Sequence, residues 1–204
     1  PVVLVRAHQS EVVLELVLAV VAVHPVLPAL QALRLNDPVE PSDGFRFVLN
    51  QDLAGFGGDV RYLRTEIQSA YYHEVFRGWV ASFTGNAGFA VGWGGDEIRI
   101  NDRFFKGGNS FRGFDVGGLG PRTVQRDATT GELVRGDSLG GRLYAIGALE
   151  LQLPSFLPEQ YGIRGALFTE FGTLGMLDSA DQIDEGTSSI FTVDDLALRA
   201  SAGL

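Results

Sequence analysis

Arg112 stands in a run of glycine and phenylalanine near the middle of the chain, where residues 103–114 read RFFKGGNSFRGF. A solvated loop needs few bulky aromatic side chains, so we expect burial of Phe104, Phe105, Phe111 and Phe114. A guanidinium that enters an interior with them needs a carboxylate, because an unpaired buried charge is costly. The chemistry predicted for Arg112 is therefore charge pairing, in a loop that folds back into the protein.

Strands must position this loop, because the dominant period beyond residue 36 is two. In Trp79–Trp93 the odd positions are mostly apolar and the even positions are small or polar. At roughly 3.3 Å per residue this segment spans about 46 Å, or about 35 Å along the axis of a tilted barrel. Such a strand is longer than is usual in a soluble domain and puts a tryptophan near each interface of a membrane.

The same alternation recurs in five more segments, which predicts an all-β, antiparallel fold of about six to seven strands. These segments are Phe45–Asn50, Leu63–Tyr72, Leu143–Leu153, Tyr161–Phe171 and Leu196–Leu204. Alternation fits two folds, because the apolar face can point into a soluble sandwich or outward to lipid. Strand length, the paired tryptophans and charged residues in mid-strand favour a transmembrane β-barrel. A soluble β-sandwich binding module, with Phe83, Phe89 and Trp93 in its core, is the alternative.

Two segments depart from the alternation. Residues 96–138 form a connection far longer than usual, which is typical of a functional loop. Its first half has the aromatic and glycine content of an ordered segment, whereas 122–137 is expected to be solvated. Residues 1–35 contain no glycine, asparagine, aspartate, threonine, phenylalanine, tyrosine or tryptophan. We interpret them either as a core helix or strand, or as a mis-framed segment that adds a short non-native helix.

Composition excludes several functions. The chain has no cysteine, which rules out disulfides and thiolate metal sites, and its net charge of -9 argues against nucleic acid. His73 has Glu74 beside it but no nucleophile nearby, and the acidic residues 178–185 fit no calcium loop. No glycine-rich run follows a strand and opens a helix as a phosphate loop does. We therefore expect no enzyme, with no catalytic residue, metal or cofactor.

An ordered set of motifs resembles a known family. The set comprises Gly107-Gly108, then Phe111-Arg112-Gly113-Phe114, GLGPR at 118–122, Gly140-Gly141, ALEL at 148–151 and FTEFG at 168–172. Upstream, DPVEP at 37–41 and LAG at 53–55 also fit. Over roughly residues 36–204 the chain resembles the BamA assembly factors of the bacterial surface antigen superfamily, which are outer-membrane barrels.

The resemblance implies roles for the residues of the loop. In this family the arginine-bearing loop lies inside the barrel, and its arginine pairs with acidic residues on neighbouring strands. Carried over, Arg112 meets Glu150 and Glu170, which both fall on the predicted polar face, and its planar fork suits carboxylates. Gly113 allows a close backbone approach, and Phe111 and Phe114 pack against the barrel wall. Glu170 stands where aspartate is usual, and Phe111 where a smaller β-branched residue is common.

The resemblance also implies a function and a place. It implies that residues 36–204 are part of an incomplete barrel domain, without the family's closing strands and periplasmic repeats, in the bacterial outer membrane. The implied function is the folding and insertion of other barrel proteins. The implied partners are outer-membrane lipid, unfolded outer-membrane proteins and assembly lipoproteins, and no nucleic acid. A polypeptide-secretion pore of the same superfamily is the alternative.

Overall fold

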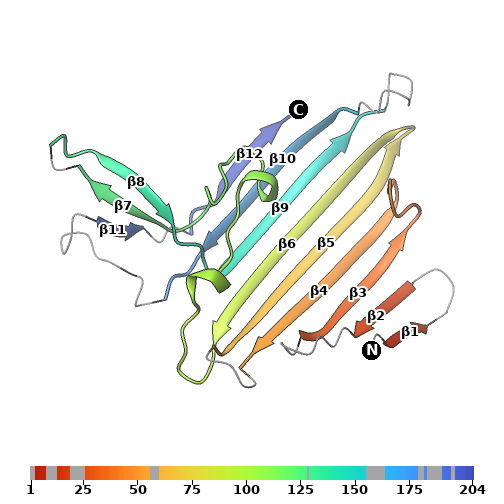
Figure 1. Cartoon of the computed structure of the whole chain (residues 1–204). Coiled ribbons are helices and arrows are strands. Elements are labelled where there is room, and N and C mark those ends of the chain that lie inside the picture. The colour runs from red at the N-terminus through yellow and green to blue at the C-terminus, as the bar shows by residue number, and fades with distance from the viewer. Residues whose placement is uncertain are drawn as a thin grey trace.

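The computed structural model describes residues 3–7, 13–18, 26–55, 60–127, 129–154, 164–178, 182, 190–193 and 196–204. In this part of the chain the strands form an antiparallel sheet of nine strands and a smaller sheet of three (Figure 1). None of the helices described there is long and apolar enough to cross a membrane.

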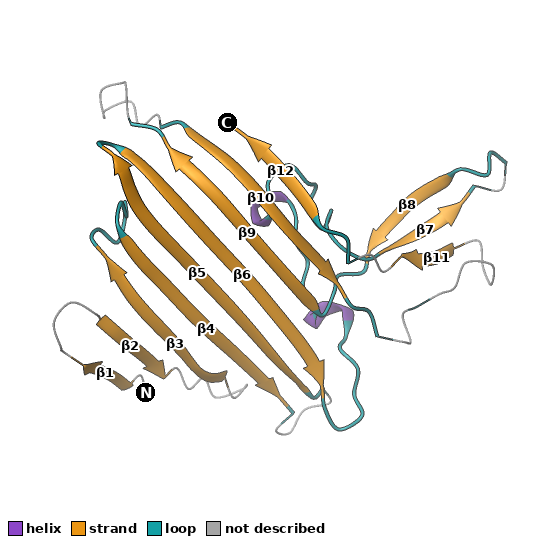
Figure 2. Ribbon diagram, turned by 180° about the vertical axis from the view of Figure 1, so that it is seen from behind, coloured by secondary structure: helices purple, strands orange, loops and turns teal. Residues whose placement is uncertain are grey.

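The nine strands of the large sheet follow the order of the chain, with one long excursion between β6 and β9. In spatial order they are β1 (Val3–Ala7), β2 (Val13–Leu18), β3 (Val26–Leu35), β4 (Gly44–Ala54), β5 (Tyr62–Phe76), β6 (Trp79–Gly92), β9 (Leu143–Gln152), β10 (Ala166–Gly175) and β12 (Arg199–Gly203). Figure 1 shows the part of the β6–β9 connection around η2 in front of this sheet, and Figure 2, from behind, shows the sheet partly covering that part.

The β6–β9 connection contains both short helices and two strands of the small sheet. The helices are η1 (Ile100–Asp102) and η2 (Gly108–Ser110), and the strands are β7 (Arg122–Arg126) and β8 (Leu133–Ser138). The third strand, β11 (Ile190–Val193), comes from the β10–β12 connection and pairs with β7. The small sheet projects away from the large one in both views. Of the part predicted to be solvated, most side chains of β7 and β8 are exposed, but Val124 is buried.

The six segments that alternate in the sequence correspond to β4, β5, β6, β9, β10 and β12. The predicted count of six to seven strands was too low, because β1 to β3 extend the large sheet. The prediction of a short N-terminal helix was wrong, because Val26–Leu35 is a strand. It pairs with β4 along its length, with Val26 opposite Asp52 at one end and Leu35 opposite Gly44 at the other. A segment rich in valine and leucine gains more from an open sheet edge, which supplies partners for its backbone, than from an isolated helix. Tyr161 and Ile163 lie outside the described residues.

The register of the sheet separates the two faces as the alternation predicted. Apolar residues at odd positions remain exposed on one face: Ile67, Phe83, Phe89, Val91, Leu149, Leu167 and Phe171. A soluble sandwich would bury Phe83, Phe89 and Trp93, yet they are 43, 42 and 39% exposed. An apolar face that is turned outward fits a sheet that lies against lipid.

The buried core lies on the opposite face, between the sheet and the β6–β9 connection. It consists of Ala90, Ile98, Phe104, Phe111, Leu119, Tyr144, Ile146 and Leu174. The rings of Phe104 and Tyr144 meet edge to face, with centroids 4.7 Å apart. Gly88 makes room for this contact, because a Cβ there would collide with both rings. The first part of the connection, from Ile98 to Leu119, therefore contributes to the interior.

Candidate functional site

The arginine loop, residues 104–119, leaves the rim of the sheet and returns to it. Phe104 and Gly141 exchange two backbone hydrogen bonds of 2.9 Å, and the N–H of Leu119 donates to the carbonyl of Lys106 at 3.2 Å. Beyond these bridges the chain turns sharply, with Gly107 at φ 135° and Gly108 at φ 57°, a region that favours glycine. The N–H of Gly108 donates to the carbonyl of Phe114 at 2.8 Å. The tip is thus a small folded unit.

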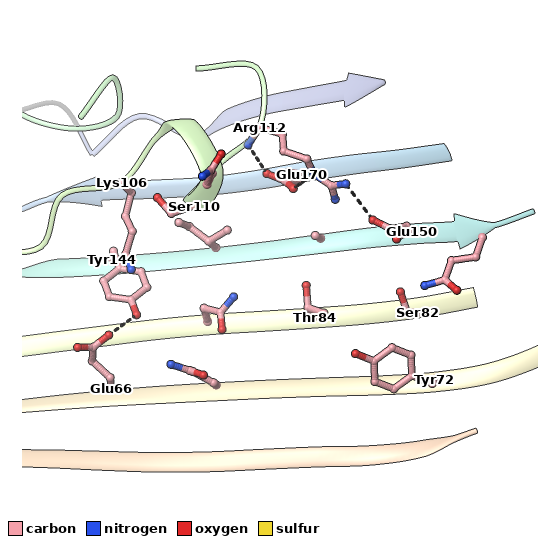
Figure 3. A pocket seen from close by; sticks show the side chains of 16 residues that line it. Glu66, Tyr72, Ser82, Thr84, Lys106, Ser110, Arg112, Tyr144, Glu150 and Glu170 are labelled. Atoms are coloured by element: carbon pink, nitrogen blue, oxygen red, sulfur yellow. Dashed lines mark hydrogen bonds and ion pairs between the residues drawn. The ribbon is translucent and has the colours of Figure 1, made fainter. Parts of the chain in front are cut away.

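Arg112 joins this tip to two adjacent strands (Figure 3). Its Nη1 donates to Glu150 Oε2 at 2.9 Å, and its Nε donates to Glu170 Oε1. The backbone N–H of Arg112 also donates to Glu170 Oε2, at 2.7 Å. The guanidinium carbon lies 3.7 Å from the ring centroid of Phe168. The structure therefore brings Arg112 together with Glu150 on β9 and Glu170 on β10, the two carboxylates that the sequence singled out.

The two carboxylates differ in environment. The Glu170 side chain is 9% exposed, the Glu150 side chain 25% and the Arg112 side chain 38%. Burial on its own would lower the pKa of Arg112, but the hydrogen bonds that it donates to Glu170 and Glu150 outweigh burial and raise the pKa. Arg112 is therefore a permanent cation. If β9 and β10 shifted by one residue in their pairing with the sheet, Glu150 and Glu170 would point to the other face. The contact with Arg112 therefore also fixes the register of these two strands.

The phenylalanines of the loop supply an apolar anchor. Phe111 is fully buried in the core, and Phe114 packs against that core with its ring centroid 5.0 Å from that of Phe111. Phe104 is buried as well, but the expected burial of Phe105 was wrong, since Phe105 is 42% exposed. Phe104 lies in a β-bridge, so the next side chain points to the opposite side of the extended backbone.

Gly113 has φ 83° and lies against β12, where an added Cβ would be 3.0 Å from Cβ of Ser201. We expect Gly113→Ala to cost about 1–2 kcal/mol in backbone strain and to push the tip away from β12. Gly95→Ala is the matched control, because Gly95 has φ 90° and open space around its Cα. Protease digestion of folded protein in detergent should cut the loop faster in Gly113→Ala only. Equal cutting in both variants would contradict a close contact with β12.

The loop makes a second polar contact, which the sequence did not predict. The Tyr144 hydroxyl donates to Glu66 Oε2 at 3.0 Å, Glu66 pairs with Arg64 at 2.7 Å, and Lys106 Nζ lies 3.9 Å from the Tyr144 ring centroid (Figure 3). Burial lowers the pKa of Lys106. The negative charge of Glu66 raises this pKa in part, and the positive charge of Arg64 lowers it. These residues come from three separate segments, so no local spacing connects them. The one sequence pattern that relates them is that Glu66 and Tyr144 both occupy even positions, which form the polar face of the sheet.

The polar face and the loop enclose a hollow of about 600 Å³. Its charged residues are Lys106 and Arg112, opposite Glu66, Glu150 and Glu170. Gln68, Ser82, Thr84 and Asn86 are among the uncharged polar residues around it. Such a surface holds water and polar groups. Within it Arg112 pairs with Glu150 and Glu170, whereas Lys106 lies over the Tyr144 ring.

The other candidates for chemistry lie elsewhere. His73 Nδ1 is 3.2 Å from Asp43 Oδ1, and both side chains are mostly exposed. Asp178, the first of the acidic residues at 178–185, is buried and paired with Arg142 at 2.5 Å. Within the described residues no cluster of acidic, histidine or cysteine side chains could hold a metal ion.

Comparison with known proteins decides the family. The Omp85 superfamily domain matches residues 30–204. The chain belongs to the Omp85 superfamily. The match begins inside β3, so it includes the end of the segment 1–35. Membership agrees with the lipid-facing strands and confirms the predicted outer-membrane barrel fold and the bacterial outer membrane as its location.

Two relatives of this Omp85 chain are named for assembly. It is 33% identical over 171 residues to the outer membrane protein assembly factor BamA of Neorickettsia risticii, which covers 83% of this chain and 21% of the relative. It is 34% identical over 136 residues to the sorting and assembly machinery component 50 homolog of Homo sapiens, which covers 65% of this chain and 26% of the relative. The chain thus spans only about a fifth to a quarter of these proteins.

A solved Omp85 structure has the same fold. The crystal structure of BamA from Haemophilus ducreyi lacking POTRA domains 1-3 superposes with a TM-score of 0.66 at 23% identity. The alignment covers 86% of this chain and 35% of the BamA chain. At 23% identity the structural similarity supports the fold alone, and membership of the superfamily rests on the sequence matches.

Proposed function

We propose that this chain supplies the loop-bearing wall of an outer-membrane assembly factor, and that the whole protein folds and inserts β-barrel proteins into the bacterial outer membrane. One observation carries the proposal: an Arg-Gly-Phe loop is bound to two adjacent strands on the inner face of a lipid-facing sheet. The relatives above are named as an assembly factor and as a component of an assembly machinery, which supports a role in assembly.

Insertion of this kind requires a template and no covalent chemistry. In lipid, unpaired backbone N–H and C=O groups are costly, so an openable sheet edge is a strong pairing site for an incoming strand. Such an edge works only if the rest of the wall keeps its register while it opens. In this proposal Arg112 supplies that rigidity at β9 and β10. No catalytic residue, cofactor or metal takes part.

The proposed partners follow from the exposed apolar face and from the family. Outer-membrane lipid contacts the apolar face, unfolded outer-membrane proteins are the substrates, and assembly lipoproteins bind the complete protein. Orientation follows from the connections: residues 77–78 join β5 and β6 at one end, whereas residues 93–142 lie at the other end. Short turns are typical of the periplasmic side and long loops of the extracellular side. The arginine loop therefore enters the barrel from the outside.

Depletion of the protein in its own bacterium tests the proposal. We expect several unrelated barrel proteins to lose their heat-modifiable gel mobility together, and a wild-type copy supplied in trans to restore them. A secretion pore of the same superfamily is the second candidate, and the polar hollow favours it, since a polypeptide could pass along such a surface. That function predicts the loss of one secreted polypeptide while the barrel proteins stay folded.

A further inference from the structure

The β6–β9 connection, which carries the arginine loop, has an outgoing and a returning limb that meet at a neck, formed by residues 97–104 and 139–142 at the rim of the sheet. Arg103 is buried in this neck. Its Nε and Nη2 donate to the carbonyl of Ile98 at 3.3 and 3.1 Å, and its Nη1 donates to the carbonyl of Leu139 at 3.3 Å. Arg103 thus ties the outgoing limb to the returning limb. These three hydrogen bonds do not connect the neck to β10.

Asp178, just past the end of β10, makes that connection. Its Oδ2 accepts the backbone N–H of Ile98 at 3.1 Å, and its Oδ1 accepts Nη1 of Arg142 at 2.5 Å. Ile98 belongs to the outgoing limb and Arg142 to the returning limb. The side chain of Asp178 is only 7% exposed. One buried carboxylate therefore binds both limbs of the neck.

The backbone around Asp178 is fitted closely to the neck. The N–H of Arg142 donates to the carbonyl of Met176 at 3.1 Å, and a Cβ on Gly141 would collide with the backbone of Gly175. Met176 has φ 67°, a conformation that a residue other than glycine adopts only where its surroundings enforce it. These contacts concern the same three segments as the carboxylate does.

We propose that Asp178 is a positioning residue, a second anchor that fixes the neck of the arginine loop to the end of β10. Glu170 lies within β10 and holds the tip, whereas Asp178 follows the same strand and holds the neck. Two attachments along one strand fix the orientation of the loop, while a single attachment lets it pivot. The functional consequence, that assembly needs both anchors, rests on the proposed function above.

Asp178→Asn tests the anchor, because asparagine keeps the shape of the side chain and removes the charge that pairs with Arg142. In the protein in its own outer membrane, we expect amide exchange in residues 97–104 and 139–142 to become about tenfold faster. We also expect an amine-reactive reagent to modify Lys106 several-fold faster, as measured on the peptide that contains it. The gel-shift temperature of the barrel should stay unchanged, which separates positioning from general destabilisation.

Two variants complete the test. Asp137→Asn makes the same chemical change on exposed β8 and is expected to leave exchange and labelling at wild-type rates. Asp178→Glu retains the charge and is expected to retain most of the protection. Equal labelling in the Asp178→Asn and Asp178→Glu variants, or wild-type exchange in Asp178→Asn, would overturn the anchor.

The assembly readout separates this proposal from the one on which it rests. If the neck opens in Asp178→Asn and barrel proteins accumulate unfolded, the anchor and the proposed function are both supported. If the neck opens and assembly continues at the wild-type rate, Asp178 is not a positioning residue for assembly, and the proposed function is unaffected. If depletion of the wild-type protein leaves barrel proteins folded, the proposed function fails, whereas the exchange result still decides whether Asp178 holds the neck.

Discussion

Arg112→Ala is expected to release the tip of the arginine loop from the sheet. The change removes the side-chain bonds to Glu150 and Glu170 and leaves two carboxylates on the inner face without this partner. Loss of one member of a buried ion pair costs roughly 3–5 kcal/mol. Because the Arg112 side chain is 38% exposed and the hollow is polar, we expect about 1–3 kcal/mol here.

The measurement is protease cleavage of the loop, with labelling of Lys106 as a second readout. Lys106 is the single lysine of residues 1–204, and its modification, measured on the peptide that contains it, reports on the loop. Arg135→Ala removes an arginine from exposed β8 and serves as the control. Arg112→Lys keeps the charge but cannot form the fork, and we expect an intermediate rate. Unchanged cleavage in Arg112→Ala would mean that the ion pairs do not hold the tip.

The contact of Arg112 could be predicted because three independent signals agreed. The aromatic run required burial, alternation put Glu150 and Glu170 on one face, and the motif order resembled a family with a known loop. Long strands such as β5 and β6 were equally visible, since register is repeated over many residues. In both cases the information is local or repeats along the chain.

The neck could not be predicted, because its residues share no pattern. Arg103 was visible only as the first residue of the aromatic run, and Asp178 only as the first of several acidic residues. Their contacts are mostly with backbone carbonyls and N–H groups, which every residue has and no sequence motif marks. For the strands β1 to β3 the sequence left helix and strand open for a different reason: with few polar residues they show little alternation, and pairing with β4 decides the structure of β3.

Phe111→Ala is expected to have the largest effect on the loop. Phe111 is fully buried between the tip and the sheet, and truncation of such a residue costs about 3–5 kcal/mol through lost burial and the cavity that remains. Phe111→Val fills part of that space, so we expect it to cost less by about 1–2 kcal/mol. Hydrogen exchange across residues 104–119 measures the change, and Phe105→Ala, at an exposed neighbour, is the control.

The comparison of Phe111→Ala with Arg112→Ala shows how the loop is built. If the tip docks as one unit, loss of the apolar anchor also separates Arg112 from Glu170, so the double variant should be less destabilised than the sum of the single variants. Additive effects would mean that the two anchors hold different parts of the loop independently. A larger effect for Arg112→Ala than for Phe111→Ala would show that charge, rather than burial, provides most of the attachment.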